Sequence, residues 1–220
     1  MAVTDPLYSS QWHFGLIGDI ETIWQEYTGA GINVGIYDDG VEASHEDLNA
    51  NYDESLEWAG DDGLPNGSSD GHGTSVAGII AADNNGLGGV GVAYDASIGA
   101  VDFLNDVQYQ NWLSVQNAFH HGVVFDVINN SWGTTPQYAD WQDMGDAGSS
   151  SSSEVALADY LTANGRGGLG TIVTKAAGNE AHDATLQGQG YYGNAAGEGL
   201  NNAFSTITIA ATDSSGNVAY

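Results

Sequence analysis

The sequence predicts an α/β fold built as a doubly wound, mostly parallel sheet with helices on both faces. Short apolar runs alternate with stretches of helical periodicity along the 220 residues. Several runs are apolar nearly throughout, as strands buried on both faces of a parallel sheet are. Repetition of strand, helix and strand implies right-handed crossover connections. No internal repeat or domain boundary is visible, so we expect one domain over 1–220.

The same patterns predict the individual elements. Strands are expected at 32–39, 96–103, 123–133, 170–179 and 205–212. Helices are expected at 18–28, 72–83, 110–121 and 153–164. The first helix has Asp19 and Glu21 in its opening turn and stops at Gly29, and Ser153 is the expected N-cap of the last. Segments 59–71, 134–152 and 183–203 are rich in Gly, Ser and Asn and predict surface loops.

Composition and charge exclude several functions. Hydrophobic residues make up 41% of the chain, which argues against disorder. Two Lys and Arg stand against 29 Asp and Glu, a net charge of -27, so we expect no nucleic-acid partner. No apolar run approaches the roughly 18 residues of a membrane span, and no signal peptide is visible. The absence of cysteine excludes disulfides and thiolate chemistry. The negative charge either attracts cations and basic peptides or is an adaptation to salty surroundings.

Polar residues gather where the expected strands end. Asp38 ends the first strand, 129–131 read Asn-Asn-Ser, and Asn179 ends another strand. Open parallel sheets place ligand sites at the carboxyl ends of their strands. Taken singly, Asp38 and Asn179 are better explained as turn residues. Their gathering at one edge favours a functional site.

His72 lies between two glycines, at the start of a helix of small residues. It is a candidate general base, with a capping or core histidine as the alternative. A carboxylate such as Asp38 can fix the tautomer of an imidazole, and an amide such as that of Asn179 can stabilise an oxyanion.

The order Asp, His, Asn along the chain resembles that of the subtilase superfamily of serine proteases, and within it the kexin/furin-like branch. Residues 34–48, VGIYDDGVEASHEDL, resemble the family's aspartate motif, and 70–78, DGHGTSVAG, its histidine motif. INNSWG, 128–133, resembles the substrate-binding strand, and 165–179 resemble the segment that ends in the oxyanion asparagine. The likeness runs from about residue 5 to Tyr220. It implies a subtilisin-like fold, serine endopeptidase activity on extended peptide or protein substrates, and a secreted or extracytoplasmic location.

The resemblance also implies a role for each matching residue. Asp38 would orient His72, His72 would be the general base, and Asn179 the oxyanion donor. Asp39 would favour a basic side chain at P2, the second residue before the scissile bond. The backbone of Ser131, Trp132 and Gly133 would pair with the substrate.

A calcium site follows from the same resemblance. Two carboxylates, one amide oxygen and three carbonyls would form it, a set that suits calcium. The matching residues are Asp5, Asp47, Asn85, Ala82, Leu87 and Gly89, and Asp183 matches a residue that helps to bind a second calcium. The alternative is a glycine-rich turn that binds no ion.

The chain departs from the family in two ways. Acids expected to bind a basic P1 side chain, the residue before the scissile bond, are replaced near Pro136 and near 187–189, so basic specificity is not predicted. The GTS sequence that carries the family's nucleophile occurs only at 73–75, inside the histidine helix. No serine is therefore assigned as nucleophile, not even Ser75, Ser205, Ser214 or Ser215. We expect the nucleophile beyond Tyr220 and a C-terminally incomplete catalytic domain.

Two other functions are weighed against this one. The first is a calcium-stabilised, catalytically inactive pseudoprotease or split partner that binds extended peptides. The second is a zinc site built from histidines. Zinc is disfavoured because no pair has helical i, i+4 spacing and two adjacent histidines on a helix point apart. The histidines concerned are His45, His72, His120, His121 and His182.

Overall fold

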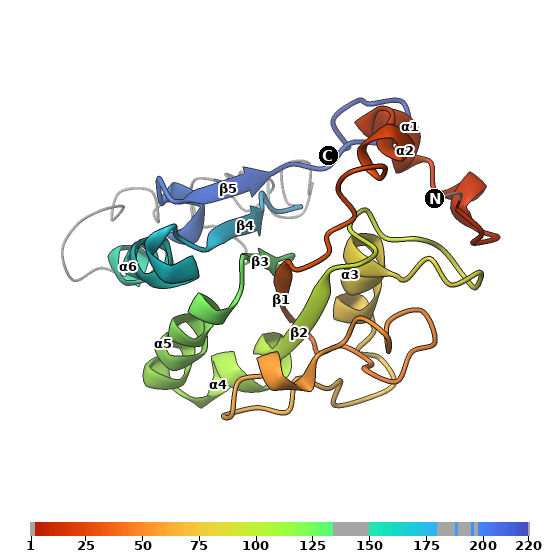
Figure 1. Ribbon diagram of the computed structural model, residues 1–220. Helices are drawn as coiled ribbons and strands as arrows, with labels where there is room; N and C mark the ends of the chain where they lie inside the picture. Colours follow the sequence, from red (N-terminus) through yellow and green to blue (C-terminus); the bar gives the residue numbers. More distant parts are fainter. Residues whose placement is uncertain (1–2, 134–149, 180–187, 189–194, 196–197, 220) are drawn as a thin grey trace.

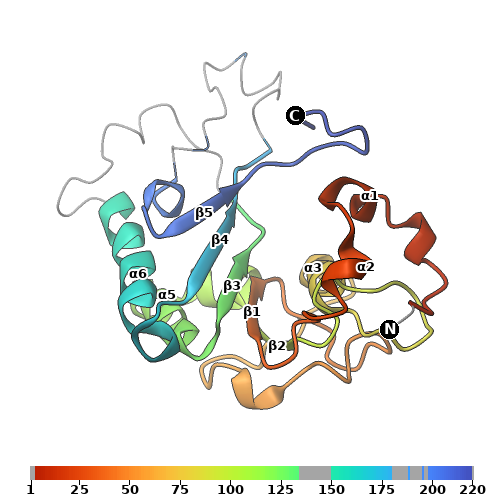
Figure 2. The same ribbon diagram turned by 45° about the horizontal axis from the view of Figure 1, so that its top comes forward.

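Five parallel strands form one sheet in the order β2-β1-β3-β4-β5 (Figures 1 and 2). The structure is a computed structural model and describes residues 3–133, 150–179, 188, 195 and 198–219. The strands are β1 Asn33–Asp38, β2 Ser97–Asp102, β3 Val127–Asn130, β4 Ile172–Ala176 and β5 Thr206–Ile209. Each lies inside a range expected from the sequence, which confirms the predicted sheet.

Helices connect the strands. Their bounds are α1 His13–Ile17, α2 Ile20–Ile23, α3 His72–Ala81, α4 Gln108–Gln110, α5 Trp112–His121 and α6 Ser150–Asn164. The prediction of one long helix at 18–28 is wrong, because α2 ends at Ile23. The indole of Trp24 is buried there and donates to the carbonyl of Val92 at 2.8 Å, and the chain continues as turns. Ser153 is not an N-cap, since α6 begins at Ser150.

The sheet separates two apolar layers. Side chains alternate along β1, so that Ile36 faces α3 and Tyr37 faces α5 and α6. Figures 1 and 2 show α3 on one side of the sheet and α5 with α6 on the other. Gly35 lets Phe125 pack directly on β1, because a Cβ at Gly35 would lie 2.6 Å from the phenyl ring. This packing fixes the position of β1, which carries Asp38 at its end.

A third apolar cluster attaches the N-terminal segment to the chain that follows α3. Phe14 and Tyr94 each pack edge-on against the ring of Trp24. The amide of Gln11 donates to Val90 O at 2.9 Å and accepts from Val90 N at 3.0 Å. The N-terminal segment, including Asp5, is thereby held beside the loop after α3.

The strand order places the topological switch point of the sheet at the carboxyl ends of β1 and β3. The chain leaves β1 toward β2 on one side, whereas β3 lies on the other side of β1. Ligands of open α/β sheets bind at such a switch point. Among the described helices, none is long and apolar enough to cross a membrane.

Candidate active site

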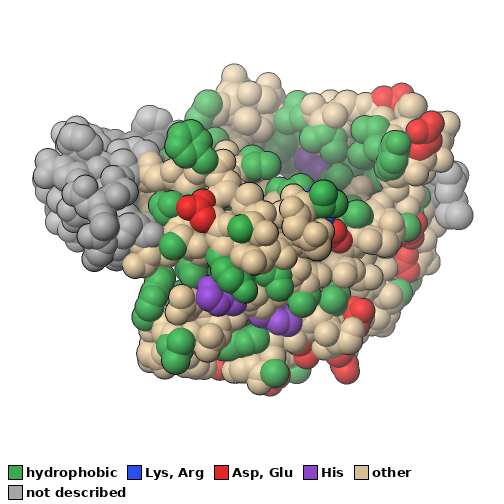
Figure 3. All heavy atoms as spheres, turned by 60° about the vertical axis from the view of Figure 1, so that its left-hand side comes forward, with side chains coloured by type: hydrophobic (Ala, Val, Ile, Leu, Met, Phe, Trp, Pro, Cys, Tyr) green, Lys and Arg blue, Asp and Glu red, His purple; other side chains and the backbone are tan. Residues whose placement is uncertain are grey.

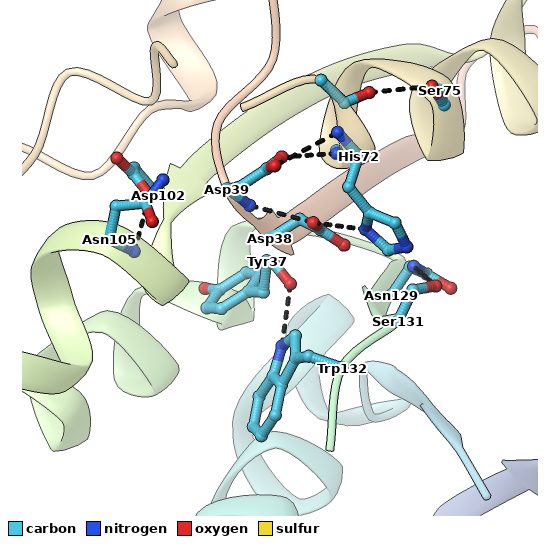
Figure 4. A network of polar contacts seen from close by, with 12 residues as sticks. Tyr37, Asp38, Asp39, His72, Ser75, Asp102, Asn105, Asn129, Ser131 and Trp132 are labelled. Atoms are coloured by element: carbon cyan, nitrogen blue, oxygen red, sulfur yellow. Dashed lines mark hydrogen bonds and ion pairs between the residues drawn. The ribbon is translucent and has the colours of Figure 1, made fainter. Parts of the chain in front are cut away.

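Asp38 and His72 are hydrogen-bonded at the switch point. Asp38 ends β1 and is fully buried, with 0% of its surface exposed. Its Oδ1 lies 2.7 Å from His72 Nδ1 and accepts from Asp39 N at 2.9 Å (Figure 4). Burial raises the pKa of the Asp38 carboxyl, and the hydrogen bond from His72 opposes that rise. The bond holds the imidazole with Nδ1 toward Asp38, so that Nε2 is available to a reacting group.

Asp39 caps the helix that carries His72. Its Oδ2 accepts from His72 N at 3.1 Å and its Oδ1 from Gly73 N at 2.6 Å. The residue that precedes α3, Gly71, makes no side-chain cap of its own. The carboxylate expected to bind a P2 side chain thus satisfies the start of α3. Sequence reasoning missed this role, for which the only signal is the glycine where a capping side chain is usual.

The small residues around His72 allow α3 to approach β1. A Cβ at Gly73 would lie 2.3 Å from Gly40 O and 2.9 Å from Asp38 Cβ. Only glycine leaves room for this approach, which brings the imidazole within reach of Asp38. The His72 side chain itself is 56% exposed, so its ring can be reached from outside the described part of the chain.

Ser131, Trp132 and Gly133 follow β3 directly. Trp132 Nε1 donates to Tyr37 O at 2.8 Å, and its ring stacks on Phe103 with 4.6 Å between centroids. Asn129 Nδ2 donates to Ser131 Oγ at 2.7 Å, and Figure 4 places both residues beside the imidazole of His72. The segment expected to bind substrate is therefore anchored next to the Asp38–His72 pair.

Asn179 follows β4 and is exposed. Because β4 pairs with β3, and β3 with β1, Asn179 belongs to the same edge as Asp38, two strands away. Its position at this edge agrees with the expected one.

The two acids expected to bind calcium both reach the loop after α3. Asp5 Oδ1 accepts from Gly86 N at 3.2 Å, and Asp47 Oδ2 accepts from Gly89 N at 3.3 Å. Both side chains are buried, and Asp5 Oδ2 and Asp47 Oδ1 have no hydrogen-bond partner among the described residues. A buried carboxylate oxygen without a partner is costly unless a cation satisfies it, so these residues fit an ion.

Two of the other expected calcium ligands accept hydrogen bonds within the loop after α3. Asn85 Oδ1 accepts from Leu87 N at 2.9 Å, and Ala82 O accepts from Gly91 N at 2.9 Å. Asp183 lies outside the described residues, as do Pro136, Gln187 and Gln189. No three His, Asp or Glu side chains converge on a metal position in the part of the chain that the structure describes.

The histidines of the zinc alternative have separate partners. His45 Nδ1 accepts from Asp47 N at 3.2 Å, and His120 stacks on Tyr160. His121 Nε2 lies 2.8 Å from Leu56 O. His182 falls outside the described residues.

Sequence reasoning also missed a buried ion pair beneath the substrate-binding segment. Lys175 Nζ lies 2.8 Å from Glu198 Oε2 and donates to the carbonyl of Trp132. A lysine within an apolar strand was the available signal, but its partner could not be identified from the sequence.

An aspartate–histidine pair at the switch point of a parallel sheet is characteristic of one class of protein, and comparison with known proteins identifies that class. Residues 29–220 match the model of the subtilase family, and the chain belongs to that family. Relatives include furin-1 of Xenopus laevis, 32% identical over 98% of this chain and 27% of that protein. Neuroendocrine convertase 2 of Bos taurus is 32% identical over 80% of this chain and 30% of that protein. The resemblance to the kexin/furin-like branch is confirmed.

Solved structures agree with the fold. The serine protease of Aeromonas sobria matches with a TM-score of 0.65 and 27% identity over 82% of this chain and 33% of that one. Fervidolysin from Fervidobacterium pennivorans matches with a TM-score of 0.59 and 25% identity, over 83% of this chain and 26% of that one. The chain spans less than a third of the length of the furin-1 and convertase relatives.

Proposed function

We propose that residues 1–220 are the N-terminal part of the catalytic domain of a serine endopeptidase. The 2.7 Å contact between His72 Nδ1 and buried Asp38 Oδ1 is the observation that carries this proposal. Membership of the subtilase family and similarity to proteases support it.

Each residue of the edge has a step in the proposed reaction. Substrate lies extended along 131–133, where backbone pairing gives affinity. The serine hydroxyl attacks the peptide carbonyl while His72 Nε2 takes its proton. Asp38 holds the imidazole and stabilises the imidazolium that forms, and the amide of Asn179 stabilises the oxyanion. His72 then gives the proton to the leaving amine.

The nucleophile is proposed to come from a segment after Tyr220. Ser75 Oγ donates to Gly71 O at 2.8 Å, one turn back in its own helix. Ser131 Oγ accepts from Asn129, and Ser205 Oγ donates to Asp159 Oδ1 at 3.1 Å. Because each of these hydroxyls already makes a hydrogen bond to another residue, we assign none of the three serines as the nucleophile.

Calcium is proposed to bind between the N-terminal segment and the loop after α3. Asp5 and Asp47 would hold it through their unpartnered oxygens, and a second site would involve Asp183. The other ligands would be Asn85 Oδ1 and the carbonyls of Ala82, Leu87 and Gly89. Bound calcium would neutralise the two buried carboxylates and tie the N-terminus to this loop. A secreted or extracytoplasmic location is proposed on the family resemblance.

Hydrolysis of internally quenched peptides by the full-length gene product tests the proposal. His72→Ala should abolish cleavage, whereas His120→Ala, which changes a ring stacked on Tyr160, should leave it unchanged. Cleavage that survives His72→Ala contradicts the assigned roles. Peptide binding without turnover would instead support the pseudoprotease function, and absence of both would exclude both functions.

A further inference from the structure

Lys175 is the only lysine of the chain and one of its two cationic side chains. It lies in β4, opposite Asn130 of β3 and Thr208 of β5, and only 1% of its surface is exposed. The other cation, Arg166, pairs with Asp126 at 3.0 Å, at the opposite edge of the sheet where β3 and β4 begin. In contrast, acidic side chains are scattered over the face in Figure 3, where hardly any cationic side chain is visible.

The ammonium of Lys175 is held against the substrate-binding segment. It donates to the carbonyl of Trp132 and lies 4.5 Å from the centroid of the Trp132 ring. Its charge is balanced by Glu198, whose Oε2 is 2.8 Å away and which is itself only 7% exposed. Lysine is buried at this depth only with such a partner.

The other carboxylate oxygen of Glu198, Oε1, lies close to the backbone of the same segment. A Cβ placed on Gly133 would lie 2.7 Å from Glu198 Oε1 and 3.7 Å from Lys175 Nζ. The ion pair therefore runs along the backbone of Trp132 and Gly133, and glycine at 133 permits the carboxylate to come this close.

Among the described residues, the carboxyl of Glu154 also interacts with the pair. Burial raises the pKa of Glu154 and the charge of Glu198 raises it further, whereas backbone hydrogen bonds from Leu200 and Gly199 and the charge of Lys175 oppose the rise. Glu198 itself faces the ammonium of Lys175 at 2.8 Å, so the cation that it pairs with comes from within the chain.

We propose that Lys175 determines the specificity of the protease by neutralising Glu198, so that peptides are cleaved after uncharged residues rather than after Lys or Arg. This inference rests on the proposed function. A substrate strand alongside 131–133 places a side chain against Trp132 and Gly133. A basic side chain there would meet the ammonium of Lys175 in a desolvated setting, with a single carboxylate shared between two cations.

Peptides that differ only in the P1 residue test the inference in the full-length gene product. With Leu, Phe, Arg or Glu at P1, kcat/KM for Leu or Phe should exceed that for Arg by about 10-fold or more. Lys175→Met leaves Glu198 without its counter-charge and should raise the Arg-to-Leu ratio about 10-fold or more. The double variant Lys175→Met with Glu198→Gln should return to the uncharged preference. Arg166→Met removes the other cation and should leave the ratios unchanged.

The outcomes separate this inference from the proposed function. Preference of the unmodified protein for Arg at P1 overturns the inference while the protease function stands. An unchanged Arg-to-Leu ratio in Lys175→Met also overturns it. Failure to cleave any peptide of the series refutes the protease function instead. If Lys175→Met does not fold, Glu198→Gln leaves the ammonium unpaired and should raise cleavage after Glu relative to Leu; no such rise counts against the inference.

Discussion

At the scale of single residues, the bond between His72 Nδ1 and Asp38 Oδ1 determines which ring nitrogen faces the substrate. In Asp38→Asn, an amide replaces the carboxylate, and this amide can stabilise the wrong tautomer of His72. We expect kcat to fall by about 10⁴-fold with little change in KM, as for the equivalent change in other Ser-His-Asp proteases. Steady-state kinetics on one quenched peptide measures this, with Asp95→Asn, an exposed acid, as the control. A kcat within about tenfold of the unmodified protein would contradict the role of Asp38.

Asp39 is the second residue whose role is testable alone. Because it accepts from His72 N and Gly73 N, Asp39→Ala should lower the free energy of unfolding by about 1 kcal/mol. Asp39→Asn keeps an accepting oxygen and should retain most of that stability. Urea denaturation of the three proteins measures the difference. If Asp39→Ala is as stable as the unmodified protein but cleaves peptides with Lys at P2 more slowly, then Asp39 binds substrate and does not act mainly as a cap.

The residues of the site differ in how well the sequence predicts them. Asp38 and His72 are predicted because each belongs to a compact local motif. The cap by Asp39 and the pair between Lys175 and Glu198 are not predicted, since each joins segments that meet only after folding. Local spacing carries no information about such a partner.

At the scale of elements, the five strands are predicted within a few residues because buried parallel strands have a continuous apolar signal. The helical signal near the N-terminus fails. Residues 18–28 contain the apolar spacing of a helix, but the indole of Trp24 is buried against the loop after α3 and the helix stops there. Tertiary packing overrides local preference at this point.

The loop after α3 is the element whose stability should depend on calcium. If calcium satisfies Asp5 Oδ2 and Asp47 Oδ1, saturation at about 100 times the Kd adds about 2.7 kcal/mol to the free energy of unfolding. Calcium should raise Tm, and a chelator should lower it.

The control is magnesium at the same ionic strength, which separates a specific ion from general screening of the negative charge. Asp47→Asn should lose most of the calcium-dependent rise in Tm. An equal rise with magnesium, or a full rise in Asp47→Asn, would contradict a calcium site at these residues.

At the scale of the whole molecule, the net charge of -27 acts on a fold that also buries carboxyl groups. Burial raises the pKa of several acids, among them Asp38, Asp61 and Glu57. For Asp102, which ends β2 opposite Asp38, burial raises the pKa to about 6. Asp53 and Asp213 have lowered pKa values because they accept hydrogen bonds, but Asp53 is only half-buried and Asp213 is exposed, so that screening by solvent weakens the effect.

The sign of the pH dependence follows from these shifts. A carboxyl with a raised pKa still holds its proton in the folded protein at a pH where the unfolded chain has released it. Its contribution to stability is therefore fully present below about pH 4 and is lost as the pH rises through about 6 for Asp102. Self-repulsion of the acidic surface grows in the same direction. We expect stability to fall between about pH 4 and 6, with Asp102 contributing at most about 3 kcal/mol.

The variant Asp102→Asn isolates this contribution from the surface charge. In the unmodified protein, Asn105 N donates to Asp102 Oδ1 at 3.1 Å and Asn66 Nδ2 donates to Asp102 Oδ2 at 2.6 Å. The amide oxygen of the variant can still accept from Asn105 N. The amide of Asn66 can turn so that its oxygen accepts from the new NH₂ group. The fall in stability between pH 4 and 6 should be smaller in this variant, by an amount of the order of 1–3 kcal/mol. Glu26→Gln, which removes one exposed acid, should leave the slope nearly unchanged. Urea denaturation at each pH with fixed calcium measures both, and parallel curves for Asp102→Asn and the unmodified protein would show that Asp102 ionises normally.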